Sequence, residues 1–168
     1  MRMASRGFGS LILVVLALLA QAGCASYDGR GLIPGKSTES EVEALMGPST
    51  QTRTAPDGEK VRYYSRLPYG RAIYAARFGS DGKLKTLEQR LSIEHLRRLK
   101  AGASRREEVR EVLGPPYRIE SLPRQDREVW TYPWQGLTNE EVLFVQFSPD
   151  GVARELFIIV DPGGIGEN

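Results

Sequence analysis

The chain contains two versions of one segment, and this internal repetition limits what it can fold into more than any other feature. Residues 35–49 return 67 positions later as residues 102–116, with six of the fifteen positions identical. Further along, residues 78–82 correspond to residues 147–151 at an offset of 69. Single-residue loop insertions between repeated structural units produce such a slow growth of the offset. The sequence therefore predicts two tandem copies of one fold.

Each copy is expected to open with a short helix whose two ends are marked by the repeated residues. A serine is predicted at the N-cap, and a Gly-Pro pair ends the helix because glycine adopts the left-handed turn and proline cannot continue the helix. In the second copy, Ser104 and Glu107 also have the spacing of a capping box. The repeat signature consists of Gly35, Ser37, Gly47 and Pro48 in the first copy and of Gly102, Ser104, Gly114 and Pro115 in the second.

Alternating apolar and polar residues after each helix predict strands that are joined by short turns. The predicted strands are 50–55, 59–66, 71–78 and 84–90 in the first copy and 117–122, 128–133, 140–147 and 152–160 in the second. Helices on a single side of an antiparallel sheet bury one of its faces. The predicted fold class is α+β, with two tandem repeats that each pack one or two short helices on an antiparallel sheet of three to four strands.

Two segments carry more particular predictions. Residues 92–100 are expected to form an additional helix between the copies, with Ile93, Leu96 and Leu99 on one face. Residues 156–160 are apolar on both faces of their strand. Because an exposed apolar edge invites association, this strand is expected at the centre of a sheet or under the other repeat.

The N-terminal residues have the character of an export signal. Arg6 closes a short basic stretch, and residues 7–20 form an apolar run that is too short for a comfortable membrane span. Cys24, the only cysteine in the chain, follows Gly23 at the place where a bacterial lipoprotein signal puts the cysteine that receives lipid such as palmitate. The alternative is ordinary cleavage after Ala22, which leaves a soluble secreted protein with a free thiol.

The segment after the signal lacks periodicity. Residues 25–34 are polar and glycine-rich, which is typical of a flexible tether. The predicted organisation is a lipoprotein signal peptide at 1–23, a tether at 24–34, repeats at 35–91 and 92–161, and a disordered tail at 162–168.

Charge argues against nucleic acid as a partner. The full chain has 23 basic and 21 acidic residues, and removal of the signal takes away Arg2 and Arg6. The remaining chain is formally neutral, whereas nucleic-acid binding requires a clustered positive excess.

The order of motifs in the second copy resembles the SmpA/OmlA (BamE-like) family of small outer-membrane lipoproteins. These motifs are the segment 96–104, a helix that ends at Gly114 and Pro115, an aromatic strand at 129–132 and a hairpin at 143–151. The resemblance covers nearly all of the second copy and, more loosely, the first. Two copies in tandem are in turn similar to the architecture of the β-lactamase inhibitor protein.

The resemblance implies a non-enzymatic accessory role at the periplasmic face of the outer membrane, with the lipid on Cys24 as anchor. It also implies envelope proteins as partners, the β-barrel assembly machinery among them. The alternative is a periplasmic inhibitor that binds a hydrolase through the joined concave sheets of both repeats.

Candidate catalytic residues are few. The segment from Pro34 to Ser37 resembles the end of a phosphate-binding loop, but Arg30 stands where that loop requires glycine. His95 is the single histidine, and no motif of a nucleophile or a metal site accompanies it. The protein is therefore predicted not to be an enzyme and to hold no metal or cofactor apart from the covalent lipid.

Aromatic residues in loops are the remaining candidates for binding. Tyr69 and Trp134 lie in the predicted loops, and Arg66 and Arg71 flank the first of them. Aromatic residues with arginine neighbours are typical of protein-contact hot spots, although the same arginines suit anionic lipid headgroups. These four residues form the predicted partner-binding site, with protein or lipid as the open alternatives.

Overall fold

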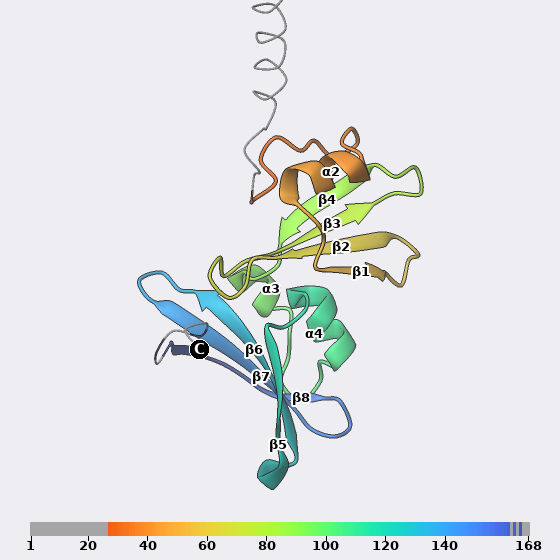
Figure 1. The fold of residues 1–168 in the computed structure, drawn as a ribbon. Helices are drawn as coiled ribbons and strands as arrows, with labels where there is room; N and C mark the ends of the chain where they lie inside the picture. The colour runs from red at the N-terminus through yellow and green to blue at the C-terminus, as the bar shows by residue number, and fades with distance from the viewer. Residues whose placement is uncertain (1–26, 162, 164, 166–168) are drawn as a thin grey trace, which may run out of the picture.

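The computed structural model describes residues 27–161, 163 and 165 of the chain (Figure 1). Over these residues it forms two four-stranded antiparallel sheets with short helices, so the predicted α+β class with two tandem units is confirmed. The elements are α2 (Glu39–Met46), β1 (Gln51–Thr54), β2 (Lys60–Ser65), β3 (Ile73–Phe78), β4 (Leu84–Gln89), α3 (Ile93–Leu96), α4 (Arg106–Leu113), β5 (Arg118–Leu122), a 3₁₀ turn (Pro123–Gln125), β6 (Arg127–Gln135), β7 (Glu140–Phe147) and β8 (Ala153–Val160).

The predictions for the signal peptide and for Cys24 lie outside the described residues, as does most of the predicted tail. Among the helices of the described part, none is long and apolar enough to cross a membrane.

Both sheets are simple meanders. Their strand orders are β1-β2-β3-β4 and β5-β6-β7-β8, so each strand pairs with its neighbours in sequence. Every strand begins and ends within two residues of its predicted bounds. The sheets also share an irregularity, because the register shifts at Arg77/Phe78 in the first and at Gln146/Phe147 in the second. These two positions correspond at the offset of 69.

The repeated glycines occupy matching places. The N–H of Gly35 donates to the carbonyl of Leu84 over 2.7 Å, and the N–H of Gly102 donates to the carbonyl of Ala153 over 2.8 Å. These contacts tie the start of each unit to the last strand of its own sheet.

The glycines that end the helices match as well. Gly47 and Gly114 have φ angles of 80° and 84°, and each N–H donates to the carbonyl four residues earlier. A positive φ favours glycine over any residue with a Cβ. Both helices therefore end in the same turn.

The predicted serine N-caps are wrong by one residue. The hydroxyl of Ser37 accepts the N–H of Ile33, and that of Ser104 accepts the N–H of Lys100, both at 3.0 Å. Each serine thus closes the turn that precedes its helix. The N-cap of each helix is the residue that follows the serine.

The observed N-caps differ between the units. Thr38 caps α2 and forms a complete capping box with Glu41. Arg105 occupies the corresponding position of α4 and makes no side-chain cap bond. The box expected around Glu107 is therefore not formed.

The elements stack in layers (Figure 1). Helix α2 covers one face of the first sheet, where Val42 and Met46 join a buried cluster with Tyr64 and Phe78. The opposite face of that sheet contributes to a larger buried cluster shared with α4 and the second sheet. Helix α4 consequently lies between the two sheets, and the two units share one core.

Opposite charges hold each helix on its own sheet, with the signs reversed between the units. Glu39 of α2 accepts from Lys60 of β2 at 2.8 Å, and Arg106 of α4 donates to Glu128 of β6 at 2.8 Å. Glu39 corresponds to Arg106, and Lys60 to Glu128. An exchange of the helices would place like charges together, which disfavours mispairing of the units.

Residues 27–34 do not form the predicted tether. Gly29 is buried, Leu32 packs against the α2 cluster, and Arg66 Nε donates to the carbonyl of Tyr27 over 3.2 Å. A Cβ on Gly29 would lie 2.2 Å from a side-chain carbon of Leu87. This close approach requires glycine at position 29.

Two further expectations are corrected. Helix α3 is a single turn instead of the predicted helix over 92–100, and it buries His95 while Ile93 is exposed. Strand β8 is an edge strand of the second sheet, so the prediction that residues 156–160 lie centrally or covered is wrong. Its inward side chains, Leu156 and Ile158, pack against the larger cluster. The outward side chains of Phe157 and Ile159 remain exposed.

Candidate functional site

Of the four residues predicted to bind a partner, Tyr69 is exposed, Arg66 is half-buried, and Arg71 and Trp134 are buried. Trp134 is only 6% exposed because the even-numbered residues of β6 face the shared core, together with Trp130 and Tyr132. Strand β6 continues to Gln135, so Trp134 lies in a strand and not in the predicted loop. Trp134 is therefore a core residue.

Arg71 is also buried and connects the units. It follows the loop between β2 and β3, and its Nη1 donates to the carbonyl of Glu141 over 2.8 Å. Its Nη2 pairs with Glu140 at 2.6 Å and with Asp161 at 3.0 Å. Arg71 thus clamps the base of this loop to the β6–β7 hairpin and to the end of β8.

Asp161 is the buried partner in this clamp. Burial alone would raise the pKa of its carboxyl. The hydrogen bonds from Arg71 and from the N–H groups of Ile165 and Gly163 outweigh burial, so the pKa of Asp161 lies below its usual value of 3.8. The carboxylate is accordingly charged at neutral pH and attracts Arg71.

Arg66 is engaged as well. Its guanidinium lies 4.9 Å above the ring of Tyr27, and its Nη2 donates to the carbonyl of Met46 over 2.8 Å. This arginine therefore fastens residue 27 and the end of α2 to the start of the β2–β3 loop. Its side chain is half-buried.

Tyr69 is the predicted residue that the structure leaves exposed, at 80%. A second exposed apolar side chain, Leu137, occupies the β6–β7 turn and is fully accessible. The two positions correspond in the repeat at the offset of 68. Sequence reasoning missed Leu137 because it weighed aromatic residues alone, although the repeat alignment with Tyr69 was a signal that could have found it.

These two turns form the hairpin-tip surface, defined here as residues 67–70 and 136–139. The clamp through Arg71 joins the bases of both turns, since it reaches the carbonyl of Glu141 from the end of the first. A rigid base with large side chains at its tips loses little conformational entropy on binding. The arrangement is suited to binding.

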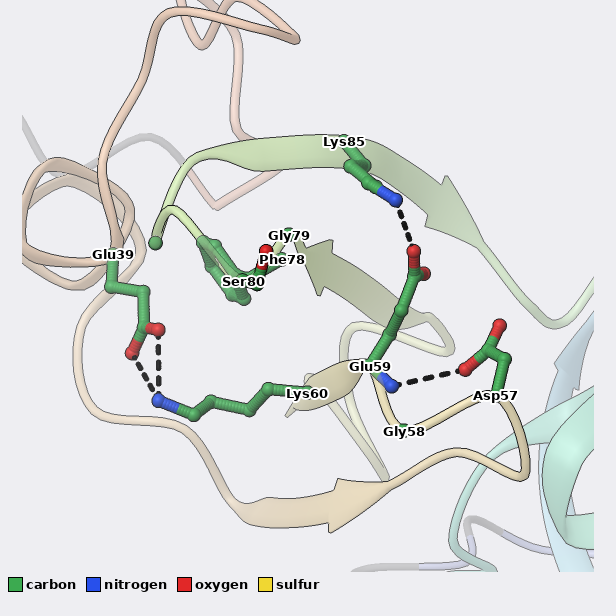
Figure 2. A pocket seen from close by; sticks show the side chains of 10 residues that line it. Glu39, Asp57, Gly58, Glu59, Lys60, Phe78, Gly79, Ser80 and Lys85 are labelled. Carbon is green, nitrogen blue, oxygen red and sulfur yellow. Dashed lines mark hydrogen bonds and ion pairs between the residues drawn. The ribbon is translucent and has the colours of Figure 1, made fainter.

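A polar cavity lies at the other end of the first sheet (Figure 2). It encloses about 450 Å³ and is bordered by ion pairs of Glu39 with Lys60 and of Glu59 with Lys85. The pKa of Glu59 is lowered mainly by its hydrogen bond from Lys85. The third carboxylate of the lining, that of Asp57, pairs with Arg77, so each of the three lining carboxylates is engaged in an ion pair.

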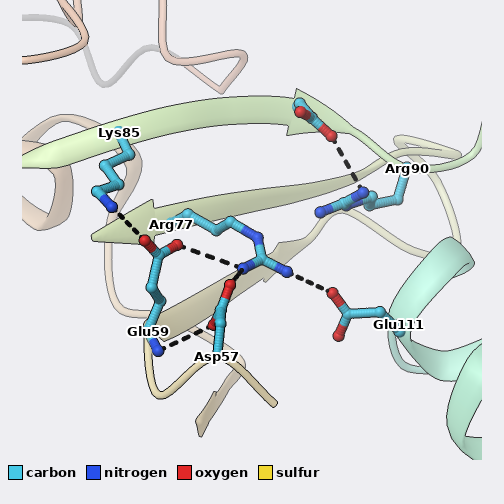
Figure 3. Close-up of polar contacts among 7 residues, drawn as sticks. Asp57, Glu59, Arg77, Lys85, Arg90 and Glu111 are labelled. Atoms are coloured by element: carbon cyan, nitrogen blue, oxygen red, sulfur yellow. Dashed lines mark hydrogen bonds and ion pairs between the residues drawn. The ribbon is translucent and has the colours of Figure 1, made fainter. Parts of the chain in front are cut away.

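A neighbouring network crosses from the first sheet to α4 (Figure 3). Arg77 of β3 pairs with Asp57 at 3.0 Å, with Glu59 at 3.3 Å and with Glu111 of α4 at 2.6 Å. Glu111 belongs to the second unit, so this network is a second tie between the units.

His95 has neither ring nitrogen free for a ligand. Its Nδ1 lies 2.8 Å from the hydroxyl of Ser92, and its Nε2 lies 3.2 Å from Nη1 of Arg90. Burial, followed by the charges of Arg90 and Arg98, lowers its pKa below the usual 6.5. Within the described residues, no group of three or more His, Cys, Asp or Glu side chains is placed to hold a metal ion.

The fold and the hairpin-tip surface thus define a tandem α+β protein with a shared core and a rigid apolar surface at the turns of equivalent hairpins. No family model and no curated protein matches the chain. It is similar to the solved structure of a DUF4309 family protein (YjgB) from Bacillus subtilis, at 21% identity over 79% of this chain and 84% of that one. The TM-score is 0.31, so the likeness carries no argument about fold or function.

The expected membership of the SmpA/OmlA family, with an architecture like that of the β-lactamase inhibitor protein, is therefore wrong. The comparison with family models matches no family, SmpA/OmlA included. The motifs that carried the resemblance are glycines, prolines and alternating strand residues. These residues specify a helix, a turn and a hairpin in any protein that needs them.

Proposed function

We propose that this protein is an exported binding protein of the cell envelope that captures another protein through the hairpin-tip surface, without catalysis. The observation that carries the proposal is the exposure of Tyr69 and Leu137 on equivalent turns whose bases are fixed by Arg71. Single exposed apolar residues are ordinary on protein surfaces. Two at matching positions on clamped turns favour a binding surface.

The charges near this surface favour a protein partner over anionic lipid. Arg66 and Arg71, for which headgroups were one of two open alternatives, are both paired within the protein, Arg71 in a buried ion pair and Arg66 through a bond to the carbonyl of Met46. Glu140, whose side chain is largely exposed, lies next to the turn that carries Leu137. A carboxylate at that place repels an anionic membrane surface.

An acyl anchor on Cys24, at the periplasmic face of the outer membrane, belongs to this proposal. Residue 27 is fastened to Arg66 at the start of the β2–β3 loop, so an anchor three residues earlier would hold that loop close to the membrane surface. Such anchoring raises the effective concentration of membrane-resident partners. Components of β-barrel assembly are among the partners that this location would allow.

The alternative is an inhibitor that binds through one concave surface formed by joined sheets, and the described residues do not form such a joined sheet. The two sheets of the described residues are separate, and α4 lies between them. A protein inhibitor would therefore have to act through the same turns.

Affinity purification of the full-length protein from gently solubilised envelopes tests the proposal. Tyr69→Ala and Leu137→Ala are each expected to weaken capture by about 1–3 kcal/mol, which is about 5- to 150-fold. Leu122→Ala, at an exposed apolar residue beside the 3₁₀ turn, is the matched control and is expected to capture normally. Undiminished capture by a folded Tyr69/Leu137 double variant would refute the proposal.

The identity of the captured protein then separates the two classes. Recovery of β-barrel assembly components would support an assembly accessory. A single hydrolase in equal amount would support an inhibitor.

A further inference from the structure

Strand β8 has one edge without a partner strand. It pairs with β7 along its whole length, from Ala153 opposite Phe147 to Val160 opposite Glu141, and it ends the order of its sheet in the described residues. Along such an edge, alternate residues direct their backbone N–H and C=O groups outward. This edge is therefore able to accept another strand.

The edge is protected at its start, where Arg154 and Glu155 are charged and Arg154 is bulged, but not along residues 156–160. Proteins commonly place charges, prolines or bulges on exposed edges, yet residues 156–160 contain none of these. In the first unit the positions that correspond to Phe157, Ile158 and Ile159 are Glu88, Gln89 and Arg90. The first sheet thus ends on a polar edge, and the second ends on an apolar one.

The outward side chains of this edge remain exposed. Phe157 is 38% exposed and Ile159 is 42% exposed. Phe157 stacks on Phe144 of β7, with ring centroids 5.5 Å apart. A further strand would place its own side chain against the open side of Phe157 and continue this row.

We infer that two copies of this protein associate by antiparallel pairing of β8 with β8, about a two-fold axis that passes beside Phe157. A strand edge is self-complementary in this arrangement, because a two-fold axis brings each outward donor opposite an outward acceptor. The pairing joins the two second sheets into one continuous sheet. It goes beyond the proposed function and uses a different surface.

The register follows from the position of the axis. Phe157 meets Phe157 of the other copy, which extends the stack begun with Phe144. Glu155 then faces Ile159, and Arg154 faces Val160, so no like charges come together. The uncharged segment meets itself, which a polar edge such as that of β4 would not favour.

Sedimentation equilibrium of the full-length protein in density-matched mild detergent tests the inference. The wild type is expected to have twice the mass of a single chain. Phe157→Lys and Phe157→Glu are each expected to halve this mass, because like charges meet at the axis. An equimolar mixture of the two variants is expected to regain the dimer, which also shows that both are folded.

The matched control lies on the opposite edge of the same sheet. Ile119→Lys replaces an apolar residue of β5 that is half exposed, and it is expected to leave the dimer intact. A wild type with the mass of one chain at the highest soluble concentration would overturn the inference. So would a Phe157→Lys protein that remains dimeric, or an Ile119→Lys protein that dissociates to the same extent.

Discussion

Replacement of Arg71 by methionine removes the clamp between the two units while keeping a side chain of similar length. The guanidinium is 4% exposed, and its partner Asp161 is 3% exposed. Without Arg71, Asp161 would keep only the backbone N–H groups of Gly163 and Ile165, at 3.3 and 3.2 Å, among the contacts described here. The variant would therefore bury a carboxylate without a countercharge.

The size of the effect follows from this burial. Removing one partner of a buried ion pair costs about 3–5 kcal/mol, and the two remaining backbone bonds place Arg71→Met near the lower end, at about 3 kcal/mol. Glu140, the other carboxylate on Arg71, is largely exposed, so Glu140→Ala is expected to cost only about 0–1 kcal/mol. The contrast between these two variants separates the buried pair from the exposed one.

Urea unfolding followed by tryptophan fluorescence measures these free energies, since Trp130 and Trp134 are both buried and Trp134 lies at the clamp. The double variant Arg71→Met with Asp161→Asn removes both charges and is expected to recover a large part of the loss. Equal stabilities of wild type and Arg71→Met would refute the reasoning. So would a cost as large for Glu140→Ala as for Arg71→Met.

The dependence on pH gives a second check. In the wild type, the lowered pKa of Asp161 contributes stability that is complete above its usual value of 3.8 and is lost as pH falls through the lower folded value. In Arg71→Met the hydrogen bond and the charge of Arg71 no longer oppose the effect of burial, so the pKa of Asp161 is expected to rise. The difference in unfolding free energy between the two proteins is therefore expected to shrink below about pH 4.

Three further predictions concern other contacts, and urea unfolding measures each. The pKa of His95 is lowered in the folded protein, so below pH 6.5 the unfolded chain binds more protons than the folded one. The free energy of unfolding is therefore expected to fall as pH drops below 6.5, and His95→Gln is expected to reduce this dependence on pH. In Gly47→Ala the new Cβ has no neighbour within 4 Å, so only the positive φ is unfavourable and the expected cost is about 1 kcal/mol. In Gly114→Ala the new Cβ also lies 2.7 Å from a methyl carbon of Ile73, and the expected cost is about 1–3 kcal/mol more. Glu128→Lys is expected to cost about 1–2 kcal/mol, because the lysine faces Arg106 and no longer accepts the hydrogen bond from Trp130 Nε1. A second change, Arg106→Glu, is expected to restore the charge pairing and so part of this loss. Equal costs for Gly47→Ala and Gly114→Ala, or no restoration, would contradict these accounts.

The helices and strands were predictable because local residues specify them. Gly47 and Gly114 both require a positive φ, and the Gly-Pro pairs end their helices whatever the rest of the chain does. Alternation fixed the strands in the same local way. The one-residue error at Ser104 arose because serine also closes turns, and the sequence does not distinguish a turn from a cap.

The arrangement of the units was not predictable, since it depends on contacts between distant residues. The interior position of Trp134 follows from the register of β6, which extends two residues beyond the predicted end. The burial of Arg71 depends on Asp161, which lies 90 positions away. The edge position of β8 could not be predicted, because apolar residues on both faces of a strand indicate a covered strand.

The hairpin-tip surface was predicted in part. Tyr69 was identified from its loop, and it is exposed. Leu137 carries no signal as a single residue, and only its correspondence with Tyr69 in the repeat marks it. The family resemblance failed for a related reason, because the motifs that carried it describe local structure.

Photo-crosslinking in living cells tests the central claim most directly. A benzophenone amino acid is placed at Tyr69, at Leu137 or, as control, at Leu122, and covalent products are identified after irradiation. The account predicts that Tyr69 and Leu137 give the same discrete product, because one partner covers both turns, and that Leu122 gives none. Absence of any product from both turns, or the same product from Leu122, would contradict it.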